Sequence, residues 1–226
     1  METVLAKIAV MLVPALFAVT VHEVAHGYVA DKFGDPTGRL LGRLTFNPLK
    51  HFDFLGTISL LVFGFGWARP VPVNFGNMKN PYWGRLAVTL AGPVSNFLLA
   101  LFFAVSLHLL AATPEQTFLG KGAAVVEPFR LMLAFGLYVN VIIGLLNLLP
   151  IPPLDGGMIL ISLLPEKQAA LVARLEPFGY VFFVMIAYYT GFWRIILAPA
   201  VFYVASFLSG GQSAAIEQIM VFPLSR

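Results

Sequence analysis

The feature that most constrains this chain is an apolar stretch, residues 8–30, that carries ionisable side chains near its far end. As a helix it would rise about 34 Å, enough to cross a bilayer core of about 30 Å. His22, Glu23 and His26 lie within it. Because an ionisable group inside a membrane helix costs about 2.5–3.5 kcal/mol, we expect these three to have a function.

Their pattern is H-E-x-x-H, which places His22 and His26 on one helix face, where they can share a metal ion. Glu23 lies toward the same edge and can act as a base toward an activated water. Two other interpretations stay open: a chance match, and buried histidines that bond to each other or to a backbone carbonyl. The cost of burial in a membrane favours the metal site.

Composition places the chain in a membrane. Of its 226 residues, 59% are apolar and 11% are charged, against about 25% charged in soluble domains. The net charge of +3 is better explained by basic loops beside a membrane than by nucleic-acid binding, so no nucleic-acid partner is expected. There is no cysteine, which leaves histidine and carboxylate side chains as metal ligands.

We therefore expect a polytopic α-helical membrane protein with about five spanning helices and a small membrane-associated β-hairpin and re-entrant segment after the first helix. After 8–30, full spans are expected at 86–112 and 126–149, and the apolar stretch 178–208 forms one or two more. A catalytic core would occupy residues 1–165. The remainder, 166–226, would hold C-terminal membrane helices and a tail.

The hairpin and re-entrant segment are predicted over residues 38–75. Residues 39–46 partly alternate between polar and apolar side chains among glycines, which is typical of a short hairpin. Residues 54–66 are apolar but too short for a full span. Val71 and Val73 alternate with prolines, which indicates an edge strand.

A break is predicted after the third span, in the segment 150–164. Pro150, Pro152 and Pro153 cannot continue a helix, and irregular backbone at membrane depth is tolerated only inside protein or beside a watery cavity. Asp155 follows the break and precedes a short helix, about 156–164. It is either the N-cap of that helix or a third metal ligand.

A patch of small residues around Gly92, followed by Asn96, lies in the second span. Helix packing is the favoured explanation for the patch, and Asn96 could in addition reach the site. If 54–66 is re-entrant, His22 and Asp155 lie on one side of the membrane. The basic residues of 31–85 lie on that same side, so the positive-inside rule places the site toward the cytoplasm, with the N-terminus outside.

The motifs HEVAHG, AGPVSN and NLLPIPPLDGG, in that order, resemble the site-2 protease family of intramembrane zinc metalloproteases. GRLTFNPLKHFDFLGT and GWARPVPVN resemble its compact prokaryotic members, which lack PDZ and CBS domains. The likeness covers about residues 15–165. It implies a prokaryotic inner-membrane protein whose single Zn²⁺ ion is held by His22, His26 and Asp155.

The resemblance also implies that Glu23 is the catalytic base and that Asn147 contacts the substrate or an oxyanion; an interhelical hydrogen bond is the alternative for Asn147. The expected activity is regulated intramembrane proteolysis by a zinc-activated water. The expected substrates are single-span or signal-peptide-like membrane proteins within the lipid bilayer. An extended substrate segment could pair with the edge strand at Val71 and Val73.

Pro152, in the hydrated break, and Asn96 complete the predicted substrate contacts. Two other functions compete with proteolysis: a non-proteolytic metal-binding membrane protein and a metal transporter. The carboxylate of Glu23 argues against the first, and the single broken helix argues against the second. The sequence leaves the oligomeric state open.

Overall fold

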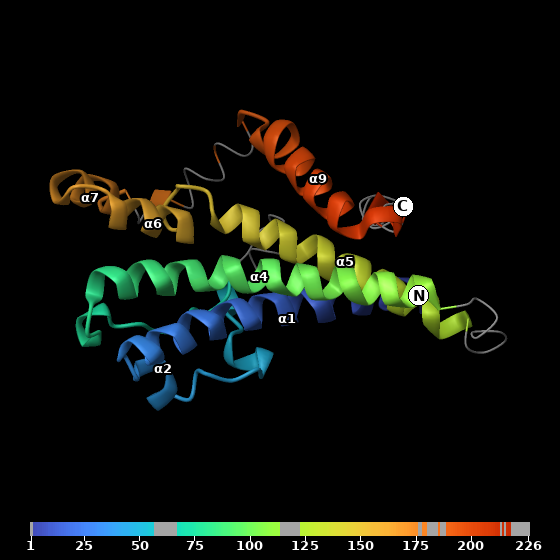
Figure 1. Ribbon diagram of the computed structural model, residues 1–226, viewed down its shortest axis with the longest axis horizontal. Helices are drawn as coiled ribbons and strands as arrows, with labels where there is room; N and C mark the ends of the chain where they lie inside the picture. Colours follow the sequence, from blue (N-terminus) through green and yellow to red (C-terminus); the bar gives the residue numbers. More distant parts are fainter. Residues whose placement is uncertain are drawn as a thin grey trace. The chain divides into compact units, whose positions relative to one another are not determined.

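The computed structural model describes residues 2–56, 67–113, 123–175 and 189–212, together with 178, 179, 185, 214, 216 and 217; these are helices joined by loops (Figure 1). Within the described ranges, three helices are long and apolar enough to cross a membrane: Val10–Phe33, Pro81–Ala112 and Val126–Asn147. A further apolar helix, Trp193–Ser209, is shorter. The chain is thus a mostly helical membrane protein.

The long helices are α1 (Glu2–Phe33), α4 (Pro81–Ala112) and α5 (Ala123–Asn147), and the shorter ones are α2 (Thr37–Leu40), α6 (Asp155–Leu163), α7 (Glu166–Ala173) and α9 (Ala198–Ser209). Short 3₁₀ turns occupy Pro48–Lys50, Phe75–Asn77 and Gly210–Gln212, and Trp193–Leu197 is a π-helical stretch before α9.

The expected spans 8–30, 86–112 and 126–149 coincide with α1, α4 and α5 to within a few residues. Helix α4 begins earlier, at Pro81, because Asn80 caps it: the Asn80 side chain accepts a hydrogen bond from Trp83 N at 3.2 Å. Hydropathy marks the apolar part of a helix and misses such a polar first turn. The expected total of about five spans is unconfirmed, since residues 180–184 and 186–188 of the stretch 178–208 lie outside the described residues.

The expected β-hairpin is not seen: none of the described residues forms a β-strand. Thr37–Leu40, which overlaps the expected first strand, is helix α2. Gly42 then takes a φ of +64°, and Arg43 N donates to Gly38 O at 2.9 Å, so the chain turns back on the helix instead of pairing with a strand. In the predicted re-entrant segment, residues 57–66 lie outside the described part of the chain.

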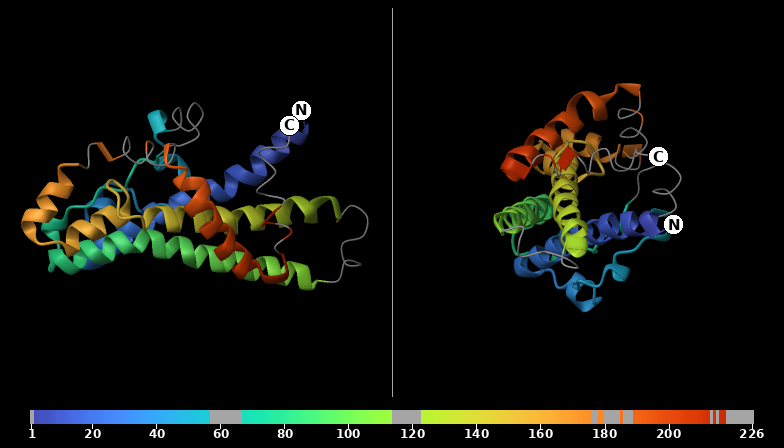
Figure 2. Two further views of the ribbon diagram at one scale, coloured as in Figure 1. Left: turned by 90° about the horizontal axis from the view of Figure 1, so that it is seen from above. Right: turned by 90° about the vertical axis from the view of Figure 1, so that its right-hand side faces the viewer.

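The chain divides into two compact units. The first comprises residues 1–18, 96–145 and 188–226. In it α4 and α5 run side by side (Figure 2), and glycines on α5 make room for phenylalanines on α4: a Cβ on Gly136 would lie 2.7 Å from the ring of Phe103. Asn96 is fully buried here; its Nδ2 donates to Asn140 Oδ1 at 2.8 Å and to Ala18 O at 3.3 Å.

The second unit comprises residues 19–95 and 146–187. Its centre is the C-terminal half of α1 packed beside the first half of α4 (Figure 1), where Ala30, Met78 and Val88 form a small core. Val73 packs against that core. All three residues of the predicted metal site belong to this unit, so its packing determines their geometry.

Candidate active site

Helix α1 presents two imidazoles from adjacent turns. His22 and His26 have ring centroids 4.6 Å apart, and their Nε2 atoms lie 3.0 Å apart. His26 Nδ1 lies 2.7 Å from Val88 O on α4, and a carbonyl oxygen can only accept, so Nδ1 carries the proton. A neutral His26 therefore keeps Nε2 unprotonated and able to bind a metal ion.

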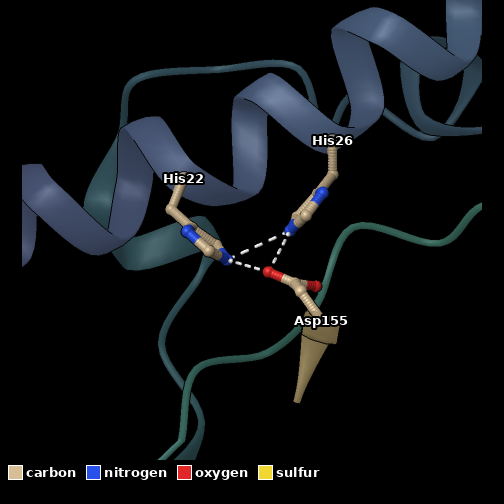
Figure 3. Close-up of side chains that lie close together, drawn as sticks. All are labelled: His22, His26 and Asp155. Atoms are coloured by element: carbon tan, nitrogen blue, oxygen red, sulfur yellow. Dashed lines mark hydrogen bonds and ion pairs between the residues drawn. The ribbon is translucent and has the colours of Figure 1, made fainter. Parts of the chain in front are cut away.

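Asp155 belongs to the second sequence segment of this unit, residues 146–187. Helix α5 stops at Asn147, the backbone turns through 148–154 with a cis bond between Pro152 and Pro153, and Asp155 opens α6. The cap position belongs to Leu154, and no side chain caps the helix, so the Asp155 carboxylate is not used as an N-cap. It faces the two imidazoles instead (Figure 3).

Gly156 and Gly157, which follow Asp155, allow α6 to start in direct contact with the backbone of the preceding turn, residues 148–152. A Cβ on Gly156 would meet the carbonyls of residues 148 and 149, and one on Gly157 would lie 2.6 Å from Ile151 C. Any larger residue would push α6 away from the turn. The Gly-Gly pair thus fixes where the Asp155 carboxylate is delivered.

The three side chains fit a metal ion. Asp155 Oδ2 lies 3.2 Å from His22 Nε2 and 3.4 Å from His26 Nε2. Three ligands at about 2.0–2.1 Å in a tetrahedral arrangement stand about 3.3 Å from one another, which matches these separations. Asp155 Oδ2 is also buried and accepts no hydrogen bond from the described residues, as expected of an oxygen reserved for a cation. Two imidazoles and a carboxylate suit zinc.

Gly92 on α4 closes one side of this group. A Cβ at this position would come within 2.5 Å of Cε1 of both His22 and His26. The small-residue patch of the second span therefore serves helix packing, as favoured from the sequence, at the point where the packed groups are the two imidazoles.

Glu23 lies next to His22 on α1, and its carboxylate is held from outside the helix. Val71 N donates to Glu23 Oε2 at 3.0 Å. Val71 lies in a stretch without helix or strand, residues 67–74, that contacts α1 through this hydrogen bond. Because a hydrogen bond from N–H to a carboxylate is short and strong, Val71 restricts the rotamers open to Glu23.

The other predicted site residues are more scattered. Asn147 is the last residue of α5 and half-buried, and Asn96 belongs to the first unit, with the amide bonds described above. Pro152 is buried in the break, where its carbonyl faces Gly179. Val73 packs into the small core. The structure thus brings together His22, His26 and Asp155, while the roles of Asn147, Asn96, Val73 and Pro152 stay predictions.

Sequence reasoning missed the Val88 carbonyl and the Val71 amide. Both act through the main chain, which leaves no mark in side-chain patterns. For Val71, an indirect signal exists in the prolines at 70 and 72: they remove the neighbouring N–H groups and leave Val71 as the single donor among these three residues.

Comparisons with known proteins show which sequences this chain is similar to. The model of peptidase family M50 matches residues 10–190. The chain is 40% identical over 176 residues to "Putative zinc metalloprotease YwhC" of Bacillus subtilis, covering 78% of each protein. It is 33% identical over 180 residues to "Putative zinc metalloprotease Rip2" of Mycolicibacterium smegmatis, covering 76% of this chain and 63% of that one. No solved structure matches the chain.

Proposed function

The chain belongs to peptidase family M50, the site-2 proteases, and we propose that it is an intramembrane zinc endopeptidase that hydrolyses peptide bonds of single-span membrane proteins. The observation that carries the proposal is the approach of three donor atoms, two Nε2 and one Oδ2, to 3.0–3.4 Å of one another beside Glu23. A protein set of three ligands leaves a fourth position open, as in catalytic rather than structural zinc sites.

His22, His26 and Asp155 hold the ion in this proposal. Zinc, when bound, supplies a Lewis acid that polarises the scissile carbonyl group and makes a neighbouring water more acidic. The Val88 carbonyl holds the His26 proton on Nδ1, so that Nε2 stays available. Because Asp155 is negatively charged, the net charge of the site with the ion bound would be one unit lower than with three neutral ligands.

Glu23 moves the proton. Its carboxylate accepts a proton from the attacking water while the water oxygen bonds to the carbonyl carbon, and it then gives that proton to the amine nitrogen as the C–N bond breaks. Asn147 is proposed to donate its amide N–H to the developing oxyanion, which would favour the transition state over the bound substrate.

An extended substrate segment is proposed to lie along the stretch 67–74, next to Glu23. Strand addition uses main-chain N–H and C=O groups. Val71 N is already bonded to Glu23, and Pro70 and Pro72 have no N–H, so the substrate would pair through other backbone groups of this stretch.

The site is proposed to face the cytoplasm of a prokaryotic cell, reached by water through the Pro-rich break at 150–154. The support is the concentration of basic residues in the loop between α1 and α4, against a single lysine, Lys121, between α4 and α5. Cysteine-accessibility labelling of Lys50→Cys and Lys121→Cys in intact cells measures this directly. Labelling of Lys50→Cys from the outside would contradict the proposed orientation.

The proteolytic function is tested with the full-length chain purified in detergent, a single-span model substrate and the variant Glu23→Gln. The native chain should bind one zinc ion and cleave, whereas Glu23→Gln should bind zinc and not cleave. Glu166→Gln is the matched control, because Glu166 is exposed on α7 and is not among the predicted site residues. Cleavage by Glu23→Gln would show that Glu23 is not the catalytic base. Zinc binding with no cleavage by the native chain would favour the non-proteolytic alternative.

A further inference from the structure

Val71 is locked in place by its side chain as well as by its amide. The side chain is only 5% exposed and sits over two glycines, Gly27 on α1 and Gly38 on α2, which we call the glycine notch. A Cβ on Gly27 would lie 2.7 Å from Val71 Cγ1, and one on Gly38 would lie 2.9 Å from the same atom. Both distances are shorter than carbon–carbon contacts allow, so the notch exists only because these residues are glycines.

The same stretch is anchored three residues later. Asn74 N donates to Asp35 Oδ2 at 2.7 Å, and Asp35 is fully buried just beyond the end of α1. Burial alone would raise the pKa of Asp35, but hydrogen bonds from Thr37, Asn74 and Asn77 outweigh it and hold the pKa below 3.8. Asp35 is therefore ionised at neutral pH and fixes the far end of residues 71–74.

The segment 71–74 is thus held at two points by carboxylates from α1 and its C-terminal extension. Pro72, between the two points, restricts the backbone further because its ring fixes φ. A segment held in this way has little freedom to move, so the Val71 N–H stays in a fixed position beside the Glu23 carboxylate. A general base must be oriented within a fraction of an ångström, and a glutamate side chain has several rotamers from which to choose.

We propose that Val71 is a positioning residue for the general base: the glycine notch fixes Val71, and its N–H holds the Glu23 carboxylate in the orientation that accepts the proton. The proposal rests on the peptidase function stated above and adds a residue that acts through Glu23. It places the effect of Val71 on the chemical step, so that disturbing the notch lowers kcat and leaves KM and metal content nearly unchanged.

The experiment is a mutant cycle on the notch in the full-length protein. Gly38→Ala adds the Cβ that meets Val71 Cγ1, while its other neighbours, Leu44 Cδ2 at 3.5 Å and Pro72 O at 3.7 Å, are in ordinary contact. We expect kcat to fall about 10- to 100-fold, as displacement by about 1 Å does elsewhere. Val71→Ala removes Cγ1 and keeps the N–H, so the double variant should recover most of kcat. Rescue would trace the loss of kcat to the contact with Val71 Cγ1, and an unchanged KM and zinc content in Gly38→Ala would distinguish a positioning effect from a merely structural defect.

Leu40→Ala is the control on the same helix, because Leu40 is 74% exposed. It should leave kcat, KM and zinc content as in the native chain. If the native chain cleaves and Gly38→Ala cleaves equally fast, or if the double variant is no faster than Gly38→Ala, the positioning role is overturned while the peptidase function stands. If the native chain does not cleave, both are overturned.

A second measurement needs no activity and no metal: hydrogen exchange of the Val71 amide in the metal-free protein. Glu23→Ala removes the acceptor and should speed exchange about tenfold or more, whereas Glu23→Gln keeps an acceptor oxygen and should change it little. Gly38→Ala should speed exchange at Val71 as well. Equal exchange in the native chain and Glu23→Ala would show that the contact is absent, and the proposal would fail.

Discussion

Gly92→Ala should greatly weaken zinc binding while leaving the helices in place. The added Cβ would stand 2.5 Å from Cε1 of His22 and of His26, whereas carbon atoms pack at about 3.5–4.0 Å. One or both imidazoles would have to retreat by about 1.0–1.5 Å. Metal sites tolerate deviations of about 0.2 Å in ligand distance, so the displacement exceeds that tolerance about fivefold or more.

We therefore expect zinc affinity to fall about 100-fold or more, and the overpacking to cost about 1–3 kcal/mol of stability. The assay is zinc titration with a competing chelator, followed by cleavage at saturating zinc. Gly84→Ala is the matched control on α4: its Cβ would meet the flexible Met78 side chain, which can move, and no metal ligand. Native zinc affinity in Gly92→Ala would refute the reasoning, as would an equal loss in Gly84→Ala.

Three further results are expected. Asp155→Asn removes the charged member of the predicted ligand set and should lower zinc affinity at least about 10-fold in the same titration, while Asp53→Asn, whose side chain accepts a hydrogen bond from Gly56 N, should not. Because the pKa of Asp35 is lowered on folding, its stabilising contribution is complete above pH 3.8 and is lost as the pH falls below that value, so thermal unfolding of Asp35→Asn should depend less on pH in the acidic range than that of the native chain. Zinc at 100 times the dissociation constant should raise the free energy of unfolding of the native chain by about 2.7 kcal/mol, and calorimetry would show this as a higher unfolding temperature that His26→Ala does not share.

The spanning helices could be predicted because hydropathy is a property of the residues themselves. Residues 8–30 and 86–112 both lie within helices of the structure, and the helices extend further where polar residues such as Asn80 begin a helix or, like Asp31 and Lys32, continue one. The hairpin could not be predicted reliably, since a few alternating residues fit a strand and a turn of helix alike. At Thr37–Leu40 the backbone forms the helix.

The side chains that make up the candidate site could be predicted from the sequence, whereas the contacts that position them could not. His22 and His26 follow from their spacing on a helix, whereas the broken helix left Asp155 open as an N-cap or a ligand, and the family resemblance implied that it is the third ligand. That Gly92 touches the imidazoles, and that Val71 N reaches Glu23, depends on how distant segments pack. Such contacts have no periodicity, so a single sequence carries at most an indirect signal of them, such as the prolines on either side of Val71.

The centre is divided along the chain, with its histidines on α1 and its aspartate at the start of α6. During synthesis the histidines leave the ribosome first, and Asp155 follows only after α4 and α5 have been made. A nascent or truncated protein that ends before α6 thus holds the base and two imidazoles but not the complete ligand set. If the proposed function holds, a chain that ends before α6 should therefore lack hydrolytic activity.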